Sequence, residues 1–257
     1  MSLNNYHTHT CFCDGKDSPE DLVLEAIRLG CGELGFSGHS YLPVDDSCMS
    51  PEGTERYKAE IRRLQEKYRG KLRILLGVEQ DCYSPAPVDG YDYVIGSVHY
   101  VLKDGVYLSV DVSEELQRQA VREHYAGDWY AFVEDYYSLV GRVRETTACD
   151  VVGHFDLVTK FNENGRLFDT GHPRYRKAVW EALDRLCGGG LIFEINTGVM
   201  TRSRRSTPYP EDFILTELRK RDIPLILSSD CHDKRFLLYG LAEQKARVPE
   251  AREKLFE

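Results

Sequence analysis

The sequence, 257 residues long, predicts one α/β barrel. Short apolar or β-branched runs alternate about seven times with amphipathic segments, and several runs are continuously hydrophobic, as in parallel strands that are buried on both faces. No linker, low-complexity tract or shift in composition divides the chain, so we expect residues 1–257 to form a single domain. The expected strands are residues 3–9, 33–39, 72–79, 91–99, 150–154, 191–196 and 223–232.

The segments between these strands carry helix signals. Ser18 followed by Pro19 combines an N-cap residue with proline at the first helical position, and Gly30 supplies a stop. Similar patterns predict helices at residues 51–68, at 113–147 with a break near Gly127, from His172-Pro173 to the glycines at 188–190, and from Tyr209-Pro210 onward.

Composition and charge narrow the class of protein. Hydrophobic residues make up 42% of the chain and charged residues 29%, as in an ordinary globular protein. The formal charge of −9 argues against nucleic acid or an anionic membrane as partner. There is no secretion signal and no apolar run of the ~18 residues that cross a bilayer. The eight cysteines form no C-x-x-C pair, so we expect reduced thiols in a cytoplasmic protein, while the oligomeric state stays open.

The predicted strands end in an unusual set of side chains. A barrel brings the carboxyl ends of its strands to one rim, where the loops form the active site. A single strand-end histidine is more often a hydrogen-bonded structural residue, but many imidazoles gathered without a cation would leave lone pairs facing one another. A metal site is therefore the stronger interpretation. The side chains at this position, which include six of the eight histidines, are His7, His9, His39, Glu79, His99, His154, Glu194, Asn196, Asp230 and His232.

The number of donors exceeds what one ion needs. A tetrahedral zinc takes four ligands, or three plus water, so two or three divalent ions are required to use them all. Glu79 is the natural bridge because its two oxygens can bind two cations. The mixed nitrogen and oxygen donors suit zinc, iron or manganese without selecting among them, and a thiolate from Cys11 or Cys13 is a minor alternative.

Eight motifs run in one order from residue 6 to residue 232: "YHTHT", "GFSGHS", "LGVEQD", "YDYVIGSVHY", "VVGHFDLVTKF", "EINTG", "STPYP" and "LILSSDCH". Together they resemble the PHP (polymerase and histidinol phosphatase) family and, within it, the monofunctional histidinol-phosphatase branch. The resemblance implies a distorted (β/α)7 barrel, similar to a TIM barrel, with a trinuclear metal site at the carboxyl ends of its strands. It also implies hydrolysis of L-histidinol phosphate to L-histidinol and phosphate, a step of histidine biosynthesis.

The resemblance also implies a ligand set for three divalent ions. Asp14 is included because the other eight ligands would leave the third ion with few ligands, although Asp14-Gly15 could also be a simple turn. The implied ligands are His7, His9, Asp14, His39, Glu79, His99, His154, Asp230 and His232.

The expected nucleophile is a hydroxide that bridges two of the ions, since metal coordination lowers the pKa of water from 15.7 to about 7. Asp230 and His232 are the candidates for protonating the leaving alkoxide. The phosphate contacts are expected from Lys160 and from the "TRSRR" loop, where the family comparison points to Arg202 first, as a catalytic contact, and then to Arg205. Arg204 in the same loop is more readily explained as a solvated side chain.

The ammonium and imidazole groups of the substrate require further contacts. Glu194, Asn196, Asp81 and Phe161 stand in suitable segments, with acids for the cation and an aromatic ring for stacking. The alternative for such acids is to orient a ligating imidazole through its second nitrogen.

Two other functions remain open. The first is a phosphoesterase of the same family with another substrate: a phosphotyrosine phosphatase, a phosphodiesterase or a nuclease. The acidic charge and the absence of a basic track disfavour a nucleic-acid substrate. The second is a metal-binding regulatory protein without turnover, against which the basic "TRSRR" loop argues.

Overall fold

The computed structural model describes residues 3–187, 190–201 and 205–256. Its centre is a curled six-stranded sheet in the order β1-β2-β3-β6-β7-β8, in which every neighbouring pair is parallel. The strands are β1 Glu33–Phe36, β2 Arg73–Asp81, β3 Tyr93–Ser97, β6 Val151–Val152, β7 Ile192–Asn196 and β8 Leu225–Ser228. Each lies within one of the predicted runs or overlaps it, so the prediction of a distorted parallel α/β barrel is confirmed.

The barrel is closed by the N-terminal segment. Asn5 bridges to Leu34 in β1, and Thr8 bridges to Cys231 just after β8, both in the parallel sense. The backbone of His9 donates a hydrogen bond to the carbonyl of Cys231 at 2.8 Å. The predicted strand 3–9 therefore occupies the seventh position. It forms single bridges instead of a regular ladder because it changes partner within three residues.

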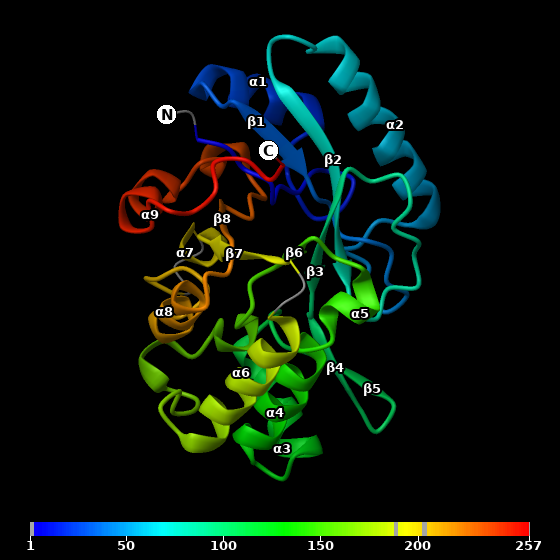
Figure 1. Ribbon diagram of the computed structural model, residues 1–257. Helices are drawn as coiled ribbons and strands as arrows, with labels where there is room; N and C mark the ends of the chain where they lie inside the picture. Colours follow the sequence, from blue (N-terminus) through cyan, green and yellow to red (C-terminus); the bar gives the residue numbers. More distant parts are fainter. Residues whose placement is uncertain (1–2, 188–189, 202–204, 257) are drawn as a thin grey trace.

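Helices cover the outside of the sheet (Figure 1). Ser18 and Ser50 each accept a hydrogen bond from a backbone N–H of the first turn that follows, as the sequence predicts for helix starts. The predicted helical region 113–147 is divided into three helices, with Gly127 at φ 85° between the first two. The helices are α1 Pro19–Leu29, α2 Pro51–Lys67, α3 Glu114–His124, α4 Trp129–Val140, α5 Val143–Thr147, α6 Pro173–Leu186, α7 Gly198–Thr201, α8 Asp212–Lys220 and α9 Leu241–Arg247.

A hairpin that the sequence analysis did not predict projects from the barrel after β3 (Figure 1). Its antiparallel strands are β4 Tyr100–Lys103 and β5 Val106–Ser109. Asp104 and Gly105 form the turn with φ angles of 51° and 79°, the left-handed conformation that an Asp-Gly pair favours in tight hairpins. This hairpin carries the chain from His99 back to the barrel rim at Asp111.

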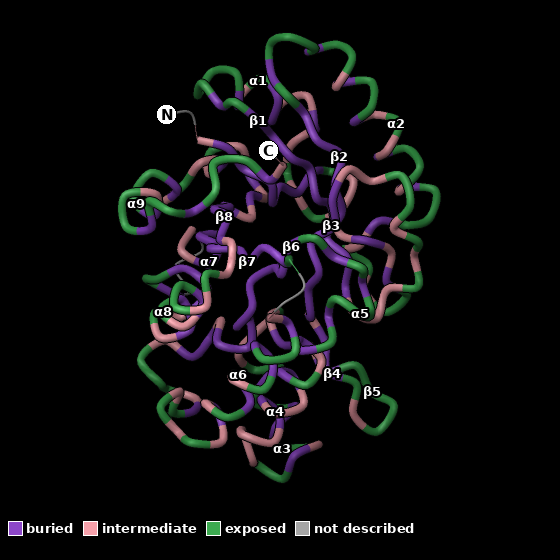
Figure 2. Tube along the Cα trace, viewed as in Figure 1, coloured by how far each residue is buried: buried purple, intermediate pink, exposed green. Residues whose placement is uncertain are grey.

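The buried residues concentrate on the strands and on the helix faces that meet them (Figure 2). One cluster, which includes Tyr6, Tyr93, Ile95 and Ile226, fills the barrel interior beneath the rim. Tyr93 crosses this space so closely that a Cβ at Gly77 would lie 2.3 Å from its ring. The packed floor holds the strands that carry the site in fixed register. Within the described ranges, no helix has the length and apolar character to cross a membrane.

Candidate metal centre

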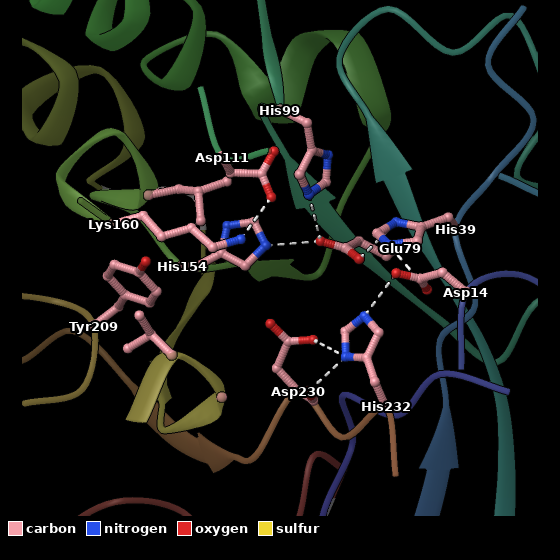
Figure 3. A pocket seen from close by; sticks show the side chains of 13 residues that line it. Asp14, His39, Glu79, His99, Asp111, His154, Lys160, Tyr209, Asp230 and His232 are labelled. Atoms are coloured by element: carbon pink, nitrogen blue, oxygen red, sulfur yellow. Dashed lines mark hydrogen bonds and ion pairs between the residues drawn. The ribbon is translucent and has the colours of Figure 1, made fainter. Parts of the chain in front are cut away.

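Most of the ligand-type residues predicted from the strand ends line one pocket at the barrel rim (Figure 3), and His7 and His9 are buried against them. They come from the N-terminal segment, from β2 and from the loops that follow β1, β3, β6 and β8. Their donor atoms form overlapping groups in which all atoms lie within 4.8 Å of one another. The groups are His9, Asp14, His39 and His232; His7, His9 and Asp230; His7, Glu79 and His154; and His39, Glu79 and His99.

Glu79 stands at the centre of this cluster. Its Oε1 lies 2.8 Å from His154 Nε2 and 3.2 Å from His99 Nε2. Its Oε2 lies 3.0 Å from His39 Nδ1 and 3.2 Å from His7 Nε2. The two oxygens of one buried carboxylate therefore face two different sets of imidazoles, the geometry that a bridging ligand needs.

Two further carboxylates complete the cluster. Asp230 Oδ1 lies 3.1 Å from His9 Nε2 and 3.6 Å from His7 Nε2. Asp14 Oδ2 lies 3.1 Å from His232 Nε2, and Asp14 Oδ1 lies 3.5 Å from His9 Nδ1. Asp14, the ligand for which the sequence also allowed a simple turn, thus points into the cluster.

Several atoms at the centre are buried without a hydrogen bond. Among the described residues, His7 Nε2, His9 Nε2, Glu79 Oε2 and Asp230 Oδ1 are shielded from solvent and make no hydrogen bond. A buried polar atom without a partner is costly, and most such atoms in folded proteins are paired. Lone pairs of imidazoles and carboxylates that face one another at 3 to 4 Å fit divalent cations of the zinc, iron or manganese type.

The electrostatics of the cluster favour ionised carboxylates. Burial raises the pKa of Glu79 and of Asp230, but the surrounding imidazoles outweigh this effect and hold both pKa values well below their usual range. Burial, with the nearby His232 and His39, lowers the pKa of His9 to about 3, so its imidazole stays neutral. Neutral imidazole and ionised carboxylate are the forms that bind metal. Despite their burial, His7, His39 and His99 have a raised pKa because the carboxylates lie beside them, so metal binding at these imidazoles would displace protons.

Two acids contact imidazoles of the cluster on the side that faces away from Glu79. Glu194 Oε1 lies 2.7 Å from His7 Nδ1, and Asp81 Oδ2 lies 3.1 Å from His99 Nδ1. Glu194 also accepts a hydrogen bond from Asn196 Nδ2 at 3.0 Å. Glu194 and Asn196 are only 1% and 0% exposed, so the structure places these two predicted substrate contacts behind the ligands and outside the pocket. Orienting an imidazole is the alternative that the sequence left open for such acids.

The opposite wall of the pocket is formed by Leu157, Lys160, Val199 and Tyr209. Lys160, a predicted phosphate contact, points into the pocket, where its Nζ lies 3.0 Å from Asp111 Oδ2 (Figure 3). Neither Asp111 nor Tyr209 was among the functional residues predicted from the sequence. The "STPYP" motif contains Tyr209. For Asp111 the signal was the Asp104-Gly105 pair between apolar residues, which favours the hairpin that returns the chain to the rim.

An adjoining pocket of about 330 Å³ opens beside the cluster. Phe161, the predicted stacking residue, lines it together with Asp45, Ser47, Asp111 and Val112. His39, His99 and Lys160 line both pockets, so the two pockets adjoin at the rim.

Arg205 does not line either of these pockets. It is 6% exposed, and its Nη1 lies 3.6 Å from Asp156 Oδ2, while its guanidinium lies 4.8 Å from the centre of the Tyr209 ring. The sequence predicted that Arg205 contacts the phosphate directly. In the structure Arg205 lies behind Tyr209 instead, because the buried Asp156 attracts its guanidinium. Arg202 and Arg204 lie outside the described residues.

The fold is a parallel α/β barrel, and a cluster of imidazoles and carboxylates lies at the carboxyl ends of its strands. These two features are typical of barrel proteins that bind metal ions. The chain belongs to the PHP domain family, whose family model matches residues 5–198. This match covers most of the chain and includes the ligand-type residues from His7 to His154.

Named relatives and solved structures agree with this assignment. The chain is 29% identical to a histidinol-phosphatase of Bacillus subtilis, over 90% of this chain and 94% of that protein. The crystal structure of a Listeria monocytogenes protein assigned as a histidinol phosphatase superposes with a TM-score of 0.79 at 21% identity, covering 93% of this chain and 99% of that one. A histidinol phosphate phosphatase from Lactococcus lactis, crystallised with zinc, L-histidinol and phosphate, gives a TM-score of 0.71 at 22% identity, covering 96% and 92%. These two structures establish the shared fold.

Proposed function

We propose that this protein hydrolyses L-histidinol phosphate to L-histidinol and inorganic phosphate, in a reaction that depends on divalent metal ions. The observation that carries the proposal is the pocket itself, which places a cluster of metal-ligand donors on one wall and the Lys160 ammonium on the other. Family membership and the names of the relatives support the same reaction.

We propose three ions in the cluster. The groups His9, Asp14, His39, His232 and His7, Glu79, His154 share no residue, so they can hold two ions independently. His99 and Asp230 are left over. Each belongs to a further group that shares one residue with each of the first two groups. A third ion would therefore be held through bridging, for which the two oxygens of Glu79 are suited.

Different residues of the pocket would serve different steps of phosphoryl transfer. Divalent ions at this site would supply an activated water and would neutralise the charge on the phosphoryl oxygens. Lys160 adds a further positive charge on the opposite wall, and Asp111 holds its ammonium in place at 3.0 Å. Because neighbouring imidazoles hold the pKa of Asp230 well below its usual range, Asp230 suits the role of a ligand better than that of the acid that protonates the leaving oxygen.

The adjoining pocket suits the rest of the substrate. Asp45 and Asp111 bring carboxylates to its wall, and Phe161 brings an aromatic ring. The carboxylates can pair with the ammonium group of the substrate, and the aromatic ring can stack against its imidazole. We further propose that the chain acts as a single domain, because residues 5–9 and 231 close the same barrel to which every strand of the large sheet belongs.

The test compares substrates on metal-reloaded protein. Phosphate release is measured from L-histidinol phosphate, p-nitrophenyl phosphate, phosphotyrosine and single-stranded DNA, with kcat/KM expected to be highest for L-histidinol phosphate. His99→Ala should abolish turnover, whereas His124→Ala, a histidine on α3 outside the cluster, should leave it unchanged. A higher kcat/KM for another substrate would overturn the substrate assignment, and metal-independent turnover would overturn the whole proposal.

A further inference from the structure

Tyr209 is held rigidly beside the metal cluster. Its backbone exchanges two hydrogen bonds of 2.9 Å with Asn196 at the end of β7, forming an antiparallel bridge. One side of its ring is covered by the Arg205 guanidinium at 4.8 Å, and the imidazole of His154 meets the ring edge-on with the centroids 6.3 Å apart. The backbone and the ring of Tyr209 are thus both held in place by their neighbours.

The Tyr209 hydroxyl has no hydrogen-bond partner in the described part of the chain, although the residue is only 2% exposed. It points toward the side of the pocket where Lys160 and His154 lie (Figure 3). Other fully buried tyrosines are paired: Tyr57 donates to the carbonyl of Gly77 at 2.9 Å, and Tyr136 donates to the carbonyl of Phe155 at 3.2 Å. A buried hydroxyl that is aimed into a pocket and lacks a protein partner is placed to bond a ligand.

We propose that the Tyr209 hydroxyl donates a hydrogen bond to a non-bridging phosphoryl oxygen of the substrate, which makes Tyr209 a catalytic residue. The inference rests on the proposed function only for the class of ligand, a phosphate monoester. A phosphoryl group held between the cluster and the opposite wall would turn its outer oxygens toward Lys160 and Tyr209, which line that wall together.

The local electrostatics suit a donor. Burial raises the pKa of the Tyr209 phenol well above its usual value, with the Arg205 cation acting in the opposite direction, so the hydroxyl keeps its proton at neutral pH. Arg205 also contacts Asp156, at 3.6 Å, which keeps the guanidinium beneath the ring and out of the pocket. In this arrangement Arg205 is a positioning residue for Tyr209.

The test is Tyr209→Phe, which removes one oxygen that no described residue bonds. Tyr175→Phe is the matched control, because the buried Tyr175 hydroxyl lies 3.0 Å from that of Tyr137, away from the pocket. Binding of inorganic phosphate to the zinc-loaded proteins is measured by calorimetry, and kcat/KM is measured with L-histidinol phosphate and with p-nitrophenyl phosphate. Zinc content and thermal midpoint are recorded for each variant.

We expect Tyr209→Phe to lower kcat/KM about 10- to 100-fold with both substrates, the range for one hydrogen bond to a charged acceptor. Inorganic phosphate should bind about tenfold more weakly, with zinc content unchanged. A loss confined to L-histidinol phosphate would place the hydroxyl on the leaving group and overturn the inference, as would unchanged phosphate binding. The phosphate titration decides the matter even where the wild-type protein prefers another phosphate ester.

Discussion

Glu194 offers the sharpest test of how the cluster is organised. Its carboxylate is 1% exposed and lies 2.7 Å from His7 Nδ1, on the far side of the imidazole from Glu79. Glu194→Gln keeps the size of the side chain but removes the charge. We expect His7 to remain in place with a weaker hold on its orientation and a less basic Nε2, because an ionised partner on the second nitrogen strengthens a histidine ligand.

The size of the effect on zinc affinity follows from the contact with His7; the Glu194 carboxylate also accepts hydrogen bonds from the backbone of His154, from Asn196 and from Ser228. A hydrogen bond to a charged partner contributes about 1.5–3 kcal/mol, which corresponds to a factor of about 10 to 150 in an equilibrium constant. Removing the orienting partner of a ligating histidine changes metal affinity by about 10- to 100-fold. We therefore expect the zinc dissociation constant of the site that His7 serves to rise about 10- to 100-fold, with kcat at saturating zinc within a few-fold of wild type.

The assay titrates metal-free protein with zinc in competition with a chromophoric chelator and then measures turnover in excess zinc. Glu33→Gln is the control, because Glu33 is also buried but its carboxylate bonds Tyr6 and Arg73, away from the cluster. Unchanged zinc affinity in a folded Glu194→Gln protein would refute the orienting role. A loss of turnover that excess zinc does not restore would instead indicate direct contact with the substrate, as the sequence alone suggested.

Two further predictions concern Asp14 and Glu211. Asp14→Asn should lower the zinc content by one ion per chain, because Asp14 belongs to a single donor group, and elemental analysis that finds the wild-type content would contradict this. Burial and the neighbouring Asp156 raise the pKa of Glu211 from 4.5 to about 7, so the folded state holds a proton that the unfolded state has lost. The resulting stabilisation is complete below about pH 4.5 and is lost as the pH rises through about 7. Urea unfolding should therefore show that Glu211→Gln loses less stability than wild type between pH 5 and pH 8, and equal losses would refute the assignment.

The strand ends were predictable because two simple regularities coincide. Continuous apolar runs mark parallel strands, and a parallel barrel sends the residue after each run to the same rim. His39, His99 and His154 could therefore be assigned to one site from residues that are far apart in the sequence. Asp14 follows no strand, and only the family resemblance and then the structure placed it with them.

Partner choice within the site was not predictable in the same way. Glu194 and His7 are 187 residues apart, and whether the acid faces the pocket or the back of an imidazole depends on side-chain packing that no periodicity records. Asp111 was missed because the β4-β5 hairpin was not predicted, although the Asp104-Gly105 turn flanked by apolar residues is a hairpin signal. Arg205 shows the same limit, since the buried Asp156 that attracts it lies in another loop.

The cluster also joins the N-terminal segment to the segment that follows β8, the two segments that meet where the barrel closes. His7 and His9 lie on the segment that closes the barrel against residue 231, and Asp230 and His232 flank that same position. The Asn5 side chain ties the two segments together through a hydrogen bond to Ser229 at 2.9 Å. Ions held by donors from both segments would bind only when the barrel is closed, so metal binding and closure would stabilise each other by the same free energy. The proposed metal centre would therefore stabilise the closed barrel that brings its ligands together.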